Sequence, residues 1–346
     1  MSKTLQDYAT LINDTIQSNE INHYITTDNM CQNLGGIDTF KNINIPQGKV
    51  RSFQKDDVLL SNIRLYFRKV YRAKQKGGCS SDVLVFRAKH IDSTTLFAIL
   101  SSQIFTDYAC SGSQGSKMPR GNKTHMMDFK IPTINFTIAK IFNSIQNKIE
   151  NNHKINELLH TLAYKIYEYY FKYKPKNAKL EQIIIENPKS SIMVKNAQKT
   201  QDKYPFFTSG DNILSYPKAI IDGRNCFLNT GGNADIKFYV GKASYSTDTW
   251  CICANEFSDY LYLLLSNIKT HINQSFFQGT SLKHLQKNLL KKYPIYMPSV
   301  HEIKKFNQII MPLLTLISIN TRTSKKLEQI RDFLLPLLLK QQVKSQ

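Results

Sequence analysis

Cationic and aromatic side chains alternate in one short stretch of the chain, residues 62–69. Arg64, Arg68 and Lys69 are interleaved there with Tyr66 and a phenylalanine. Arginine can donate two hydrogen bonds to guanine in the major groove of DNA, and lysine pairs with phosphates. We predict that this stretch ends a strand, with Arg64, Tyr66 and Arg68 on one face as nucleic-acid contacts. The alternative is a solvated edge strand whose arginines lie along the surface.

Two flexible, basic loops without acidic residues carry the next candidates. The loop at residues 112–123 contains Lys117, Arg120 and Lys123. Its counterpart in the second half, residues 278–283, contains Gln278 and Lys283. Small residues in both loops allow a phosphate to approach the backbone closely, and the cations supply charge.

A Gly-Gly turn at residues 229–233 precedes a predicted basic strand in the second half. Most turns of this kind are only hairpins, so the turn is weak evidence by itself. The second half contributes the further nucleic-acid-binding candidates Ser209, Gly231, Gly232, Asn233, Lys237 and Lys242.

The sequence lacks the motifs of common catalytic sites. It contains no GxxxxGK[ST] loop, no HExxH and no GxSxG, and Asn187-Pro188-Lys189 lacks the second proline and aromatic of an amino-methyltransferase motif. The six cysteines form no CxxC pair and do not combine with histidines at zinc-finger spacing. We predict no catalytic or metal site; a catalytic site assembled from scattered residues is the alternative.

The charge balance favours a polyanionic partner. There are 46 Lys+Arg against 26 Asp+Glu, a formal net charge of +20. Such an excess repels itself unless a polyanion or an acidic partner is near, although a low-GC genome also inflates lysine. No secretory signal peptide or membrane span is recognised, so we expect a cytoplasmic protein.

The same long helical pattern occurs twice, 168 residues apart, each time after an apolar-Pro pair. The copies run from Ile131-Pro132 to Phe171 and from Met297-Pro298 to about Leu339, with Asn152 aligned to Asn320. Near-heptad spacing predicts a coiled-coil seam in each. The predicted seam residues are Ile138, Phe142, Ile145, Ile149, Leu159, Leu162, Ile166 and Tyr170, then Phe306, Ile310, Leu313, Ile317, Leu327, Ile330, Leu334 and Leu338.

Interruptions in these helices leave alternatives open. Asn152 can fix the helix register, or it can mark a break between two shorter helices. Pro312 and Pro336 predict that the second helix is bent or frayed.

Each long helix follows a segment with the texture of short strands and turns. Strands are predicted at residues 58–60, 69–71, 82–86, 219–221, 226–228, 236–240 and 250–253, with equivalent helices at residues 93–105 and 259–272. A short amphipathic helix is predicted within residues 1–20, from Leu5, Tyr8, Ile12 and Ile16.

We therefore predict an α+β fold with two similar mixed α/β domains. The predicted boundaries are 1–132 for the first domain, 133–172 for its helix, 173–298 for the second domain, and 299–346 for the second helix and C-terminal tail. Packed as an antiparallel coiled coil, the helices would relate the domains by a pseudo-two-fold axis. The rival is an interaction scaffold whose helical seams bind other proteins.

This organisation resembles the specificity (S) subunit of type I restriction–modification systems. The stretches that carry the resemblance are Ser61–Arg64, Gly77–Val83, Gly115–Pro119, Tyr204–Gly210, Gly279–Leu285, and the exits at Ile131-Pro132 and Met297-Pro298. It covers the whole chain, and the order of these stretches with the repeat is more specific than any single one.

The resemblance implies a non-catalytic subunit in which each target-recognition domain reads one half of a bipartite double-stranded DNA target. The helices would set the spacer between the halves and dock two methyltransferase (M) subunits, and restriction (R) subunits would join that core. No cofactor is expected in this chain, because S-adenosylmethionine and ATP would reside on the partner subunits. No membrane partner is expected.

Overall fold

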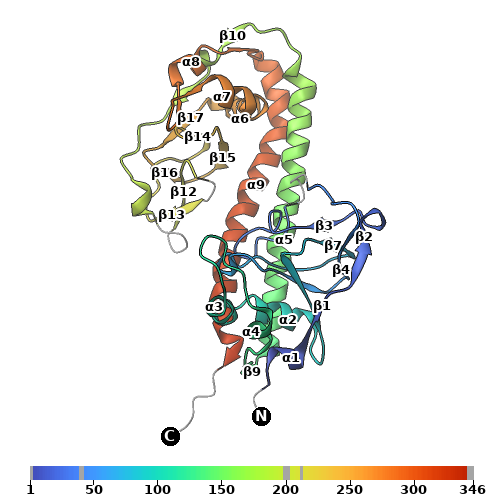
Figure 1. Cartoon of the computed structure of the whole chain (residues 1–346). Helices are drawn as coiled ribbons and strands as arrows, with labels where there is room; N and C mark the ends of the chain where they lie inside the picture. Colours follow the sequence, from blue (N-terminus) through green and yellow to red (C-terminus); the bar gives the residue numbers. More distant parts are fainter. Residues whose placement is uncertain (1–2, 39–42, 198–202, 211–212, 341–346) are drawn as a thin grey trace. The chain divides into compact units, whose positions relative to one another are not determined.

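The chain folds as two compact units, and each contains one half of both long helices. In the computed structural model, unit 1 comprises Met1–Asn151 with Ser324–Gln346, and unit 2 comprises Asn152–Thr323. The structure describes residues 3–38, 43–197, 203–210 and 213–340 (Figure 1). The predicted C-terminal tail, beyond residue 340, lies outside the described residues.

Unit 1 is built on two four-stranded sheets, with strand orders β1-β8-β5-β6 and β2-β4-β7-β3. All neighbours pair antiparallel except β3 and β7, which are parallel. The predicted strands at residues 58–60, 69–71 and 82–86 are confirmed, because their apolar runs form β5, β6 and β8. The strands are β1 (Ala9–Ile12), β2 (Thr15–Gln17), β3 (Tyr24–Ile25), β4 (Lys49–Phe53), β5 (Val58–Ser61), β6 (Val70–Arg72), β7 (Gly77–Cys79) and β8 (Val83–Ala88).

Unit 1 also contains short helices. They are α1 (Leu5–Tyr8), η1 (Ser18–Glu20), η2 (Leu65–Phe67), α2 (Ser93–Leu100), α3 (Gln103–Ser111) and α4 (Lys123–Met127). The predicted N-terminal helix is wrong beyond Tyr8, because Leu11 and Ile12 pair as a strand with Phe86 and Val85.

The helix predicted at residues 93–105 is two helices. The Ser102 side chain accepts from the Phe105 N–H at 3.2 Å and begins α3. Side-chain oxygens of this kind satisfy the free N–H groups of a helix start. The first helix, α2, is capped by Asp92, whose side chain accepts from the Thr95 N–H at 2.8 Å.

Unit 2 repeats the first sheet as β11-β17-β14-β15 and has a three-stranded sheet, β13-β12-β16, in place of the second. The parallel pair here is β12 with β16. The strands are β10 (Ala178–Lys179), β11 (Ile185–Glu186), β12 (Tyr204–Phe207), β13 (Leu214–Tyr216), β14 (Arg224–Asn229), β15 (Ile236–Val240), β16 (Ser244–Tyr245), β17 (Thr249–Cys253), β18 (Phe277–Gln278), β19 (His284–Leu285) and β20 (Pro294–Ile295).

Three of the four strands predicted in the second half are confirmed as β14, β15 and β17. The strand predicted at residues 219–221 is wrong, because only Ile221 pairs there, in an isolated bridge with Ala243. The remaining elements of unit 2 are η3 (Glu168–Lys172), η4 (Leu180–Gln182), η5 (Val194–Asn196), η6 (Asn255–Phe257), α6 (Ser258–Asn267), α7 (Lys269–Ser275) and α8 (Lys287–Lys291).

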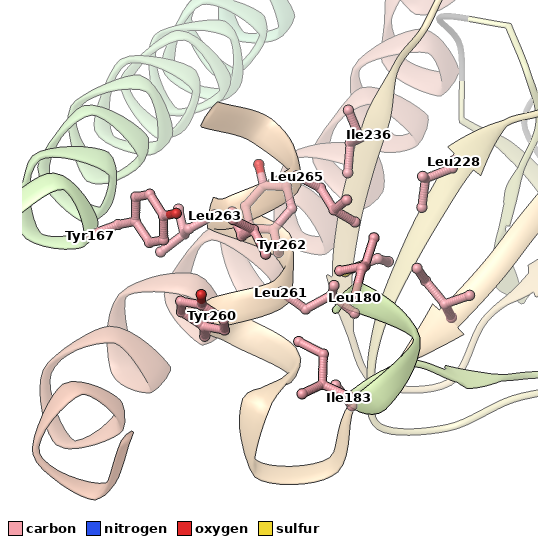
Figure 2. Packing of buried hydrophobic residues seen from close by; sticks show 14 of the residues in the cluster. Tyr167, Leu180, Ile183, Leu228, Ile236, Tyr260, Leu261, Tyr262, Leu263 and Leu265 are labelled. Atoms are coloured by element: carbon pink, nitrogen blue, oxygen red, sulfur yellow. The ribbon is translucent and has the colours of Figure 1, made fainter. Parts of the chain in front are cut away.

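The core of unit 2 lies between its first sheet, α6 and the long helices. Figure 2 shows Leu228 and Ile236 of the sheet beside Leu261 and Leu265 of α6, with Tyr167 of the first long helix at the other side of α6. All five side chains are buried, which is the main stabilisation available to such a unit.

The two long helices, α5 (Phe136–Tyr167) and α9 (Val300–Leu334), pack antiparallel within each unit. In unit 2 the Asn320 Nδ2 donates to the Asn156 Oδ1 at 3.0 Å, and Phe171, just beyond α5, contacts Phe306. In unit 1 the Arg331 Nη1 donates to the Gln146 Oε1 at 3.0 Å. The seams therefore contact one another, as the coiled-coil prediction requires.

Neither predicted interruption breaks the helices. The α5 helix is continuous through Asn152, so the alternative of two shorter helices is wrong. The α9 helix is continuous through Pro312, because Pro312 and Gln308 are exposed and water can satisfy the carbonyl that lacks a donor. The helix ends at Leu334, just before Pro336.

The seam predictions fail at two equivalent places. Leu162 and Ile330 are 47% and 48% exposed, whereas the neighbouring Ala163 and Arg331 are buried. In α9 and the turn after it, every seventh residue is buried from Ile303 to Leu338, which includes Ser324 and Arg331. Burial along α9 therefore keeps a seven-residue period even at Ser324 and Arg331, where the side chains are not hydrophobic.

Among the described residues, no helix combines the length and apolar character that spanning a bilayer requires.

Candidate nucleic-acid interface

In unit 1, the turn between β5 and β6 is joined to the basic loop that precedes α4. The Arg64 N–H donates to the Pro119 carbonyl at 2.9 Å, and the Gly121 N–H donates to the Asn62 carbonyl at 3.1 Å. Ile63 and Arg120 pair between them in an antiparallel bridge. We call this arrangement the unit 1 junction; it brings the first two predicted sites together.

The turn itself differs from the prediction. Residues 65–67 form η2, and Arg64 and Arg68 on either side adopt left-handed backbone conformations, both with φ of 50°. A strand alternation that places Arg64, Tyr66 and Arg68 on one face is therefore wrong. Local geometry of this kind leaves little signal in a sequence, because left-handed arginine is uncommon.

Each arginine of this turn contacts protein. The Arg64 Nη2 donates to the Lys117 carbonyl at 3.2 Å, and its guanidinium lies 5.9 Å from the centre of the Phe67 ring. The Arg68 Nη2 donates to the Ser101 carbonyl at 2.9 Å, and its side chain is 13% exposed. Burial lowers the pKa of Arg68 from its ordinary value. The Arg68 side chain is therefore directed toward Ser101, after α2, and toward Asp332 of α9, and away from the basic loop at residues 112–123.

The exposed cationic and aromatic side chains of the unit 1 junction are Tyr66, Lys117 and Arg120. Tyr66 is 53% exposed and its ring lies 4.7 Å from that of Phe67. Arg120 is 59% exposed, and its Nε and Nη2 atoms each lie 3.2 Å from the Asp82 Oδ1. These three residues form a cationic, partly aromatic rim, which suits contact with phosphates and bases.

Two more predicted residues of unit 1 lie apart from this rim. Lys69 donates from its Nζ to the Thr27 carbonyl at 2.5 Å, in the turn after β3. Lys123 is exposed at the first position of α4, where Asn122 caps the helix.

Unit 2 contains the same junction with the same hydrogen-bond register. The Gly232 N–H donates to the Lys283 carbonyl at 2.9 Å, and the Leu285 N–H donates to the Thr230 carbonyl at 3.0 Å. Gly231 and His284 pair in the antiparallel bridge. Positions 62–64 therefore correspond to 230–232, the same separation as in the helix repeat, and 119–121 correspond to 283–285. We call this arrangement the unit 2 junction.

Other predicted residues of the second half surround the unit 2 junction. Ser209 donates from its Oγ to the Asp248 carbonyl and accepts from the Thr230 N–H. Asn233 is exposed, and its carbonyl accepts from the Asn229 Nδ2 at 3.2 Å. Gln278 is exposed and pairs with His284 through β18 and β19.

The Lys237 side chain bonds to neighbouring parts of unit 2 and is mostly shielded from solvent. Its Nζ donates to the Thr208 and Gly210 carbonyls at 3.0 and 2.8 Å and lies 3.3 Å from the Asp235 Oδ2. The side chain is 14% exposed. It holds the turn after β12 against the hairpin of β14 and β15.

Lys242 lies elsewhere in unit 2. It is exposed and lines an open cavity together with Tyr204, Lys218 and Asp222. The structure does not bring it to the junction.

Three residues at the junctions were not among the predicted nucleic-acid contacts: Asp82, Asp248 and His284. The Asn62 N–H donates to the Asp82 carbonyl at 2.8 Å, and the Thr230 N–H donates to the Asp248 carbonyl at 3.2 Å. A signal was present, because Ser80-Ser81-Asp82 and Ser246-Thr247-Asp248 are the same short pattern in the two halves. Among the described residues, no group of three or more His, Cys, Asp or Glu side chains could hold a metal ion.

Comparison with known proteins agrees with this organisation. Residues 176–329 match a family model described as "Type I restriction modification DNA specificity domain". Through these residues, the second half of the chain is similar to the specificity domain of type I restriction–modification systems. The description names a DNA specificity domain, which agrees with the prediction of a non-catalytic chain. A search of curated proteins finds no match.

One solved structure of a type I S subunit shows the same fold. The S subunit from M. genitalium is 14% identical, with a TM-score of 0.66 over 99% of this chain and 96% of that chain. The HsdS subunit from Thermoanaerobacter tengcongensis is 13% identical over 98% of this chain and 96% of that one, with a TM-score of 0.37. The first likeness confirms the predicted S-subunit fold of mixed α/β domains and long helices.

Proposed function

We propose that this chain reads a bipartite double-stranded DNA target, one half with each unit. The observation that carries the proposal is the repeated junction, because two equivalent backbone hydrogen bonds form the same antiparallel bridge between equivalent segments in both units. We assign the two recognition domains to residues 1–132 and 173–298, and the spacer helices to residues 133–172 and 299–346.

Exposed cations at the junctions would meet the phosphates, and the remaining side chains would meet base edges. Lys117 in unit 1 and Lys283 in unit 2 are exposed. Phosphate contacts position a protein on DNA, whereas contacts in the major groove distinguish the bases. Binding of this kind weakens steeply as salt rises, because counterions are released.

The helix pair would set the unread spacer between the two halves. A polar contact joins the helices in each unit; it is buried between Gln146 and Arg331 in unit 1 and partly buried between Asn156 and Asn320 in unit 2. Buried polar pairs disfavour a slip of one helix along the other, because a slip leaves each group without its partner. The register of the pair is thereby fixed.

The outer faces of the helices would dock two methyltransferase subunits. Exposed apolar residues recur at the repeat distance: Ile141 and Ile309 are 41% and 42% exposed, and Leu162 and Ile330 are 47% and 48% exposed. Unit 1 holds one member of each pair and unit 2 holds the other. Two equivalent apolar surfaces suit two copies of one partner.

Restriction subunits would join the complex through the methyltransferase core. We assign S-adenosylmethionine to the methyltransferase subunits and ATP to the restriction subunits, and no cofactor to this chain. The rival reading, a scaffold whose seams bind other proteins, is less favoured because α5 and α9 occupy each other's seams within each unit.

Methylome sequencing tests the proposal. Cells that contain the methyltransferase are compared with and without the full chain. We expect one methylated motif with two defined halves and an undefined spacer, present only with the chain. A motif that does not depend on the chain, or a motif without two halves, would overturn the proposal.

A further inference from the structure

Arg120 differs from the other arginines of the unit 1 junction, because it is both held and exposed. Arg64 and Arg68 donate to protein carbonyls and are only partly exposed. Arg120 is 59% exposed, yet its Nε and Nη2 are both held by the Asp82 Oδ1 at 3.2 Å. The side of its guanidinium away from Asp82 therefore remains open to a ligand.

The backbone on both sides of this ion pair is fixed. The Arg120 N–H and carbonyl exchange hydrogen bonds with Gln114, both at 2.8 Å. The Asp82 carbonyl accepts from the Asn62 N–H, and Asn62 in turn accepts from the Gly121 N–H. Arg120 and Asp82 are thus tied to the same turn, so their side chains meet without further ordering of the chain.

An arginine fixed in this way is suited to one base. Guanine presents two acceptors, O6 and N7, on its major-groove edge, and a guanidinium donates to both at once. Holding the guanidinium beforehand lowers the entropy lost on binding. A lysine in the same place would supply charge without the paired donors.

We propose that Arg120 reads a guanine in the half-target of unit 1, with Asp82 as its positioning residue; this rests on the proposed function. Position 284 of the unit 2 junction is the structural equivalent, and it holds an exposed His284. His284 reads the corresponding place in the other half-target with different chemistry. The shared backbone supports two different side chains at one reading position.

The test uses the full chain assembled with its methyltransferase subunits. Duplexes that carry the methylated target, with each base pair changed in turn, are competed against the unchanged duplex. Arg120→Ala and Arg120→Lys should reduce discrimination about 5- to 150-fold at one G·C pair of one half-target, the effect of losing one bidentate contact. Asp82→Asn should relax the same pair by a smaller factor.

Two controls separate reading from folding. Lys117→Ala should weaken binding to all duplexes alike and lower the salt slope by about 0.9, as expected for a phosphate contact. His284→Ala should relax a base pair of the other half-target only. Thermal unfolding of each variant should match the wild type.

The possible results distinguish the role of Arg120 from the bipartite target itself. If the Arg120 and Asp82 variants discriminate every base pair as the wild type does, the assignment of Arg120 is overturned while the bipartite target stands. If they lose discrimination in both halves equally, the residues are structural. A wild-type complex with no bipartite motif would refute the proposed function, and the inference would fall with it.

Discussion

Replacing Leu162 and Ile330 by lysine should remove one methyltransferase subunit each from the complex. The two residues are repeat equivalents, are 47% and 48% exposed, and belong to different units. Burying a whole Leu or Ile side chain contributes about 1.5–3 kcal/mol, so the exposed half contributes about 1 kcal/mol to docking. Placing an unpaired ammonium on that surface costs at least as much again.

The expected loss is therefore about 2–3 kcal/mol per site, which raises the Kd about 30- to 150-fold. Mass photometry of the chain titrated with methyltransferase should show two subunits bound by the wild type. Each single variant should bind one, and the double variant none.

A matched control keeps the charge and moves its position. Thr161→Lys adds the same cation on the same turn of α5, at an exposed residue outside the apolar pairs. We expect this variant to bind two subunits. Loss of both subunits from either single variant, or retention of both by the double variant, would refute the reasoning.

Three further predictions concern stability. Arg331→Ala should destabilise unit 1 by about 1–3 kcal/mol in urea unfolding, because the buried Gln146 amide loses its partner. Glu302→Gln should cost about 0.5–1 kcal/mol at pH 7, with the difference shrinking in acid; the Ser299 backbone N–H bond lowers the pKa of Glu302 from 4.5 to about 2. Gly121→Ala should destabilise unit 1 by about 1–3 kcal/mol, because a Cβ would lie 2.8 Å from a Leu65 methyl.

The sign of the pH effect follows from the lowered pKa. The Glu302 carboxylate contributes its stability fully above the unfolded pKa near 4.5 and loses it as the pH falls toward about 2. A wild-type advantage that grows below pH 4 would contradict this. For the glycine, Gly210→Ala in unit 2 is the control, since its nearest neighbour would be 3.4 Å away. Equal losses from both glycine variants would contradict the steric argument.

For the long helices, the sequence predicted the repeat and the pairing but not every residue of the seam. Their repeat and antiparallel pairing followed from apolar spacing, but the seam was misplaced at Leu162 and Ile330 because apolar residues were followed rather than the period. Arg331 occupies the true seam position and is 2% exposed. A buried arginine gives no hydrophobic signal; its partners, Gln146 far away in sequence and the neighbouring Asp332, explain its burial.

The candidate site was predicted in its parts and not in its assembly. The basic loops and the Gly-Gly turn were identified, yet their register depends on long-range backbone contacts that composition does not encode. Arg68 and Lys237 were selected for their charge, although both donate to protein carbonyls. Charge marks a surface in general, whereas partners within the fold decide which cations remain available.

The equivalence of Arg120 and His284 has a consequence for the orientation of the complex. A target with identical inverted halves reads the same from either strand, so a protein with matching readers could bind it in two directions. The equivalent position holds an arginine beside Asp82 in the unit 1 junction and a histidine in the unit 2 junction. If both residues read bases as proposed, the preferred target would be non-palindromic, and only one direction of binding would satisfy both units.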